Sequence, residues 1–160
     1  MKLTTKDYIS LVIWIASFLL MGSFIGSLTQ NGVNSWYSTL NRSPLTPPNY
    51  LFGVVWSILY AMIAISGWII WRSKAHLSEL KRIKGLYISQ LILNWSWSPI
   101  FFTYQLPDIA LICLCLIVTL VSLLVYKTRK HLKTVCILLT PYLLWLLFAT
   151  HLNFYIWQHN

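Results

Sequence analysis

The chain has 160 residues, of which 58% are hydrophobic and only 9% are charged. Such a composition excludes an ordinary soluble domain, in which about 25% of the residues carry charge. The formal net charge of +9 would suit a nucleic-acid-binding protein, but no stretch interleaves basic and aromatic residues on a solvated face. We therefore expect no nucleic acid among its partners.

Five charge-free runs divide the chain, and each contains a segment close to the roughly 20 apolar residues that span a bilayer. These runs are Tyr8–Asn41, Ser43–Trp71, Gly85–Pro107, Ile109–Tyr126 and Thr134–Asn160. They predict an all-α membrane protein, a five-transmembrane-helix bundle that forms a single domain over residues 1–160. Its helices are expected at about residues 8–28, 50–71, 85–104, 109–126 and 134–157.

The first helix carries Gly22 and Gly26 in a G-x-x-x-G spacing, which lets a second helix backbone approach closely. Packing within the same bundle is the favoured interpretation, and the face of a homodimer is the alternative. A long outer loop, about residues 29–49, follows this helix, and its length suggests a functional role. The loop ends in Pro47-Pro48, which cannot stand inside a helix, so we interpret it as a stiff lid over the bundle.

The third helix, about residues 85–104, carries a polar stripe. Gln90, Asn94 and Ser98 recur at i, i+4 and i+8, so they lie on one face, with Trp97 beside them. Pro99 follows directly and is expected to kink the helix near its outer end. The stripe therefore points into the bundle or lines a cavity.

The fifth helix, about residues 134–157, carries Trp145, Ala149 and Asn153 on one face by the helical period. The small side chain of Ala149 leaves room for a flat molecule beside Trp145. At 1.5 Å rise per residue, Trp56 of the second helix lies at a similar depth, about 9 Å from the outer end. These side chains suit a mostly apolar small-molecule pocket under the loop, although tight helix packing explains them equally well.

Basic residues are distributed unevenly between the predicted loops. Arg42 is the only one of the twelve on the side of the first and third loops, and the other eleven lie on the side of the N-terminus. This bias places the N-terminus in the cytoplasm and the C-terminus outside. The lipid bilayer, including its anionic headgroups, is therefore an expected partner.

Catalytic and metal-binding patterns are missing from the sequence. His151 has no second metal-type ligand near it, so no metal site is expected and it is interpreted as a packed histidine. The predicted spans contain no carboxylate that could couple transport to protons. Catalytic triads and glycine-rich phosphate loops are also absent.

Several blocks of residues, in matching order along nearly the whole chain, resemble the TspO/MBR family of translocator and tryptophan-rich sensory proteins. The blocks are Trp36-Tyr37, Leu40, Pro47-Pro48, Phe52, Val55-Trp56, Leu59-Tyr60, Trp71, Leu93 to Ser98, Phe101-Phe102, Pro141-Tyr142, Trp145, Ala149, Leu152-Asn153 and Ile156-Trp157. The resemblance implies a multi-pass membrane protein, here expected in a bacterial inner membrane. It also implies a cavity under the first loop that binds porphyrins such as protoporphyrin IX, or haem, with no cofactor required.

The ligand-binding positions that the resemblance implies fall on eight residues. They are Tyr37, Pro47, Trp56, Tyr60, Asn94, Trp97, Trp145 and Ala149. A porphyrin-binding sensor or translocator is the function expected. The alternatives are a light-dependent porphyrin-degrading enzyme, in which Trp56 and Trp145 would be catalytic, and a membrane scaffold without a dedicated ligand.

Two features depart from the family pattern. The lid lacks the usual aromatic residue before Pro47, because Leu45 stands in that region. The cholesterol motif of mammalian relatives needs a basic residue after its tyrosine, and none follows Tyr155. Sterol binding is therefore not expected from this motif.

Overall fold

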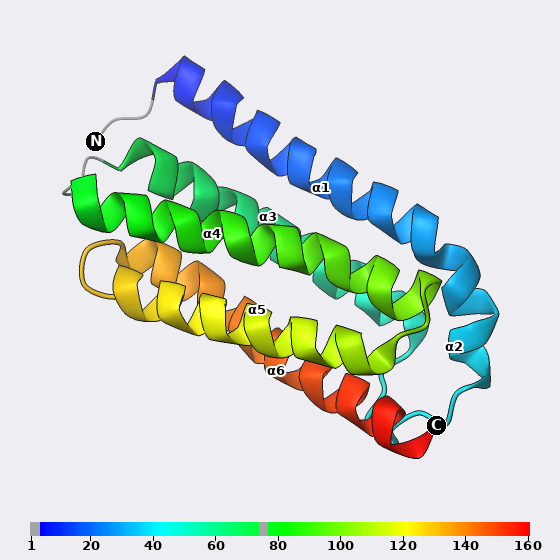
Figure 1. Cartoon of the computed structure of the whole chain (residues 1–160). Helices are drawn as coiled ribbons and strands as arrows, with labels where there is room; N and C mark the ends of the chain where they lie inside the picture. The colour runs from blue at the N-terminus through cyan, green and yellow to red at the C-terminus, as the bar shows by residue number, and fades with distance from the viewer. Residues whose placement is uncertain (1–3, 74–76) are drawn as a thin grey trace.

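The computed structural model describes residues 4–73 and 77–160, and this part of the chain is helical with no strand. Its elements are α1 (Thr5–Asn34), α2 (Trp36–Thr39), α3 (Asn49–Arg72), α4 (Leu77–Ser98), the π-helix η1 (Pro99–Thr103), α5 (Pro107–Thr128) and α6 (Lys133–His159). The long helices α1, α3, α4, α5 and α6 lie side by side, and the short α2 crosses one end of the bundle (Figure 1). We call this end the α2 end.

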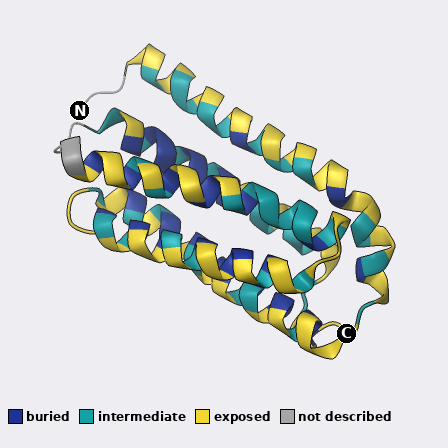
Figure 2. Ribbon diagram, viewed as in Figure 1, coloured by how far each residue is buried: buried dark blue, intermediate teal, exposed yellow. Residues whose placement is uncertain are grey.

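The core lies between α3, α4, α5 and α6, where α5 packs against both α4 and α6. Ile63, Ile117 and Leu139 are fully buried there. Helix α1 is peripheral and packs mainly on α3, so that only Phe18 and Thr29 among its residues are buried (Figure 2). The face that α1 turns away from the bundle is therefore free to contact lipid.

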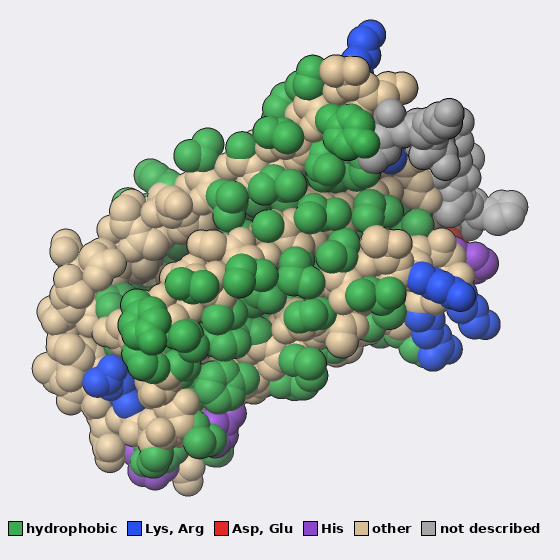
Figure 3. Space-filling model, turned by 180° about the vertical axis from the view of Figure 1, so that it is seen from behind, with side chains coloured by type: hydrophobic (Ala, Val, Ile, Leu, Met, Phe, Trp, Pro, Cys, Tyr) green, Lys and Arg blue, Asp and Glu red, His purple; other side chains and the backbone are tan. Residues whose placement is uncertain are grey.

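Four helices of the described chain, α1, α3, α5 and α6, are long and apolar enough to cross a membrane. Helix α4 is as long as α5, but its first turns contain Glu79, Lys81, Arg82 and Lys84, which lower its mean hydropathy. On the face shown in Figure 3, hydrophobic side chains cover the middle, and most of the visible lysines and arginines gather at one end. This distribution is the one expected of a multi-pass membrane protein.

The prediction of a long outer loop at about residues 29–49 is largely wrong. Helix α1 continues to Asn34 and α2 begins at Trp36, so within the predicted loop only Ser35 and residues 40–48 lack helical structure. The prediction ended the helix where the apolar run ended, but a helix continues beyond a bilayer wherever its polar residues find partners. The Thr29 hydroxyl donates to the Ile25 carbonyl at 3.0 Å, and Gly32 lies against the Phe102 backbone.

The kink predicted at Pro99 takes the form of the π-helix η1, in which the Tyr104 N–H donates to the Pro99 carbonyl at 2.9 Å. Proline has no N–H for the regular ladder, so the helix widens at this point. Likewise α4 begins at Leu77, earlier than predicted, because its charged first turns are helical outside the apolar segment. The π-helix directs Phe101 and Phe102 toward α2.

The end of the bundle opposite α2 is held together by contacts between α1 and α3. Arg72 forms an ion pair with Asp7 and lies over the Trp68 ring, 4.7 Å from its centroid. The Trp68 indole N–H donates to the Ser10 hydroxyl at 2.8 Å. Because two of these side chains come from α1 and two from α3, they fix the peripheral helix to α3 at this end.

Candidate functional site

A cavity of about 520 Å³ lies in the half of the bundle next to α2. Its walls come from α1, α3, α4, η1 and α6, and Tyr37 of α2 closes its top. The volume falls within the roughly 300–1,000 Å³ that is usual for small-molecule sites. No acidic or basic side chain lines it among the described residues, so the cavity is suited to a ligand with an apolar body.

Seven of the eight residues singled out from the sequence line this cavity. They are Tyr37, Trp56, Tyr60, Asn94, Trp97, Trp145 and Ala149. Pro47 does not, because it lies on a shallow groove of the loop formed with Arg42, Ser43 and Pro48. The lid position predicted for the prolines is occupied instead by the last turns of α1 and by α2, which continue the helical chain over the cavity.

Aromatic rings form the broad walls of the cavity. Trp56 lies 5.5 Å from Tyr60 on α3, and Trp145 of α6 lies 5.9 Å from Phe52, measured between ring centroids. Ala149 follows Trp145 by one turn of α6 and adds no bulk. Such rings offer large flat contact faces at a small cost in side-chain entropy, so they favour a planar ligand.

The floor of the cavity is a buried hydrogen-bonded chain. The Tyr60 hydroxyl donates to Asn94 Oδ1 at 3.1 Å, Asn94 Nδ2 donates to the Tyr142 hydroxyl at 2.9 Å, and that hydroxyl donates to Gln90 Oε1 at 3.0 Å. All four side chains are buried. The chain joins α3, α4 and α6 and fixes the Asn94 amide, as the polar stripe on α4 predicted. The sequence analysis gave no site role to Tyr142, which bridges the two amides.

A second polar contact holds the side wall. The Trp97 indole N–H donates to Asn153 Oδ1 at 3.2 Å, and Asn153 Nδ2 donates to the Pro107 carbonyl at 2.7 Å. Asn153 therefore ties α4, α5 and α6 together and also lines the cavity, so it takes part in both the helix packing and the pocket that were weighed for this face of the fifth helix. Trp97 also stacks on Phe101, with ring centroids 5.3 Å apart.

The roof of the cavity, formed by α2, is held in place by contacts of Tyr37 and Asn160. Tyr37 meets Phe102 edge-on at 5.4 Å between centroids, and the Arg42 guanidinium lies over the Tyr37 ring, 5.3 Å from its centroid. Burial raises the pKa of the Tyr37 hydroxyl, against the opposing effect of Arg42, so this group stays protonated at neutral pH. Asn160 reaches back from the end of α6, where its Oδ1 accepts from the Asn41 N–H at 2.9 Å.

Several lining residues were missed in the sequence. Phe52, Gly53 and Ser57 of α3 border the cavity, and their spacing from Trp56 and Tyr60 places them on the same side of the helix. This helical spacing could have identified them from the sequence. Phe52, Phe101 and Phe102 were noted only as members of the matching blocks. The π-helix that orients Phe101 and Phe102 was not foreseen.

A helical membrane protein with an aromatic small-molecule cavity at one end is the class that these observations define. The chain belongs to the TspO/MBR family, whose model matches residues 11–158. It is 37% identical over 155 residues to the tryptophan-rich protein TspO of Archaeoglobus fulgidus, covering 96% of this chain and 99% of the relative. It is 33% identical over 142 residues to the human translocator protein, covering 88% and 84%. The TspO protein of Bacillus cereus is 31% identical over 149 residues, with 91% and 95% covered.

Proposed function

We propose that this protein binds a tetrapyrrole, protoporphyrin IX or haem, in the cavity next to α2, and acts as a membrane porphyrin sensor or translocator. The observation that carries the proposal is that Trp56, Trp145 and Ala149 lie on one uncharged cavity of about 520 Å³. The two indoles supply flat faces, and Ala149 leaves a gap beside Trp145. A planar macrocycle with an apolar body matches this arrangement better than a compact ligand does.

Titration of the purified protein with protoporphyrin IX in detergent tests this proposal directly. Porphyrin in the cavity lies against Trp56, Trp97 and Trp145, so saturable quenching of tryptophan fluorescence is expected, with one porphyrin bound per chain. A matched titration with an apolar molecule that is not planar should give at least about tenfold weaker binding. Quenching that never saturates would contradict specific binding and favour the alternative of a membrane scaffold without a dedicated ligand.

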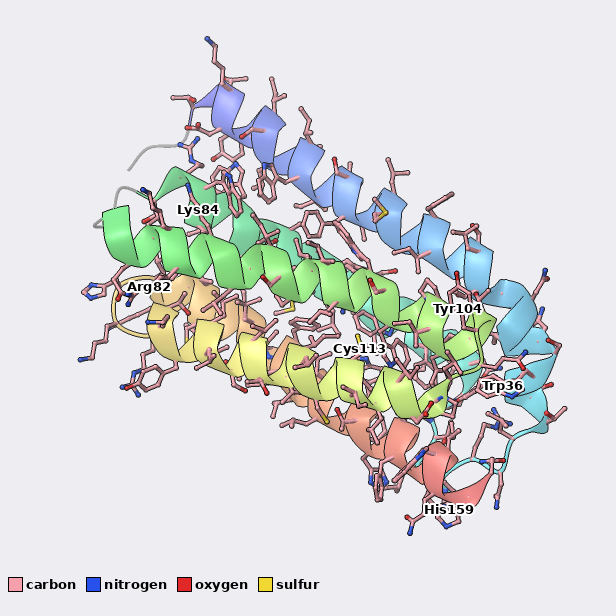
Figure 4. All side chains as sticks on the ribbon, viewed as in Figure 1. Trp36, Arg82, Lys84, Tyr104, Cys113 and His159 are labelled. Carbon is pink, nitrogen blue, oxygen red and sulfur yellow. The ribbon has the colours of Figure 1, made fainter. Side chains whose placement is uncertain are left out.

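We also propose a five-span topology in which α4 crosses the membrane with its charged first turns in the cytoplasm. Arg82 and Lys84 lie at the end opposite α2, whereas Trp36 and Tyr104 lie at the α2 end (Figure 4). The N-terminus then lies inside, and the cavity opens toward the outer half of a bacterial inner membrane.

Reporter fusions after Asn160 check this topology. An enzyme that is active only outside the cytoplasm should be active there, and the same reporter inserted after Lys130, in the loop between α5 and α6, should be inactive. The opposite pattern at both sites would invert the topology, and activity at neither site would show that α6 does not cross the membrane.

Light-dependent porphyrin degradation is a second candidate function. It is favoured by the placement of Trp56 and Trp145 on the same cavity, because both indoles would then contact one bound porphyrin. Indole is much easier to oxidise than the benzene rings of the phenylalanines that line this cavity. The cavity residues offer no other group suited to catalysis, so binding is the property that both candidate functions share.

A further inference from the structure

The cavity is closed on most sides and open on one. The residues that line it from α4, η1 and α6 are all buried or half-buried. Its exposed lining residues lie on two helix edges that face each other: Ser23, Gly26, Gln30 and Asn34 on α1, and Asn49, Gly53 and Ser57 on α3. The open side is therefore a slot between α1 and α3.

The lower limit of the slot is fixed by a direct contact between the two helices. A Cβ atom added at Gly22 would lie 2.6 Å from the Tyr60 ring, whereas one added at Gly26, a turn higher, would meet no atom within 4 Å. A Cβ at Gly53 on the facing edge also meets nothing within 4 Å. The helices thus touch at Gly22 and separate above it, along about 12 Å of α3 between Ser57 and Asn49 at 1.5 Å per residue.

The lower part of the slot opens between apolar helix surfaces that suit lipid. Its edges alternate with exposed apolar side chains of the same helices, Phe24 and Leu28 on α1 and Val54 and Ile58 on α3. The route over the top, by contrast, is occupied by α2 and its aromatic contacts, and by the Asn41–Asn160 hydrogen bond. A molecule dissolved in the membrane can therefore reach the opening between α1 and α3, whereas the way over the roof is blocked by α2 and its aromatic contacts.

The slot edges also differ in polarity along their length. Gln30, Asn34 and Asn49 lie at the upper end, near the membrane surface in the proposed topology, and the glycines and serines lie below them. Gln30 and Asn34 are already joined by a 2.9 Å hydrogen bond. The upper end can hold the polar edge of an amphipathic molecule, while the lower edges, formed by Gly26, Gly53 and two serines, place no large side chain in the way of a flat apolar ring.

We infer that the slot between α1 and α3 is the entrance through which the cavity takes up its ligand sideways from the outer leaflet. The ligand class is then a flat amphipathic molecule partitioned into the bilayer. The inference rests on the proposed tetrapyrrole binding for its ligand, but the slot itself is testable without a porphyrin.

Stopped-flow tryptophan quenching by protoporphyrin IX in proteoliposomes tests the entrance. Gly26→Leu and Gly53→Leu fill the slot, and both changes favour helix. Association and dissociation should each slow by at least about tenfold, because a blocked passage hinders both directions. Gly85→Leu is the matched control, since Gly85 is an exposed helical glycine with nothing within 4 Å of its Cβ and lies outside the cavity. Dissociation that is unchanged or faster in both slot variants would overturn the inference.

The alternative route, in which the ligand enters over α2, is tested by Asn160→Ala, which removes the hydrogen bonds to Asn41. Lateral uptake predicts rates equal to wild type. Faster exchange in Asn160→Ala, together with unaffected slot variants, would show that the ligand passes the roof instead.

A labelling experiment uses no porphyrin. Ala149→Cys is prepared in a chain whose Cys113, Cys115 and Cys136 are replaced by alanine, and it is treated with a pyrene maleimide dissolved in the bilayer or with a charged maleimide added outside. Lateral access predicts labelling by the pyrene reagent only, slowed at least about tenfold by Gly53→Leu. Preferential labelling by the charged reagent would exclude the slot. If wild-type protein fails to bind porphyrin but the Ala149→Cys protein shows this labelling, the proposed ligand is refuted and the entrance between α1 and α3 is supported.

Discussion

Ala149→Trp is expected to abolish porphyrin binding, with a loss of at least about 100-fold in affinity, or ~2.7 kcal/mol. Ala149 lies one turn from Trp145 on α6 and borders the cavity, where it is 8% exposed. An added indole would occupy the gap in which we place the macrocycle. The measurement is the protoporphyrin IX titration followed by tryptophan fluorescence, corrected for the additional tryptophan.

The same substitution on the lipid-facing side of α6 serves as the control. Leu144 is 62% exposed and does not line the cavity, so Leu144→Trp should bind porphyrin like wild type. Ala149→Leu adds less bulk and should show an intermediate loss even if Ala149→Trp folds poorly. Wild-type affinity in a correctly folded Ala149→Trp protein would show that porphyrin does not bind in this cavity.

The long helices were predictable because hydrophobicity and length suffice to locate a membrane-spanning segment. Residues 50–71, 109–126 and 134–157 were expected, and α3, α5 and α6 extend only slightly beyond them. The end of α1 was missed because its last turns are polar and are stabilised by neighbours that a bilayer argument does not include. Gly32 shows this, since it lies against the Phe102 backbone.

The candidate site was predictable to the extent that helical spacing and depth bring side chains to one level. Trp56, Asn94 and Ala149 meet at the cavity for that reason. Pro47 was misplaced because the conformation of a loop depends on contacts remote in sequence, here the bond from Asn41 to Asn160. The opening between α1 and α3 could not be foreseen, because it depends on where two helices diverge and no local pattern encodes their separation.

Trp56→Phe and Trp145→Phe are expected to separate binding from photochemistry. Phenylalanine keeps a flat apolar face, so each variant should retain most of its porphyrin affinity. The Trp145 indole N–H is buried without a hydrogen-bond partner in the described structure, so this substitution breaks no hydrogen bond. If an indole donates an electron to light-excited porphyrin, the benzene ring, which is much harder to oxidise, cannot replace it.

The deciding assay follows porphyrin absorbance under illumination at matched ligand occupancy. Enzymatic degradation predicts that the decay seen in wild type falls by at least about tenfold in either variant. Trp157→Phe is the control, because Trp157 is exposed and lies outside the cavity, and it should decay like wild type. Equal decay in all of these proteins, or none in wild type, would leave a binding protein whose tryptophans provide only stacking surface. Loss of decay with binding intact would instead identify Trp56 and Trp145 as the redox-active pair.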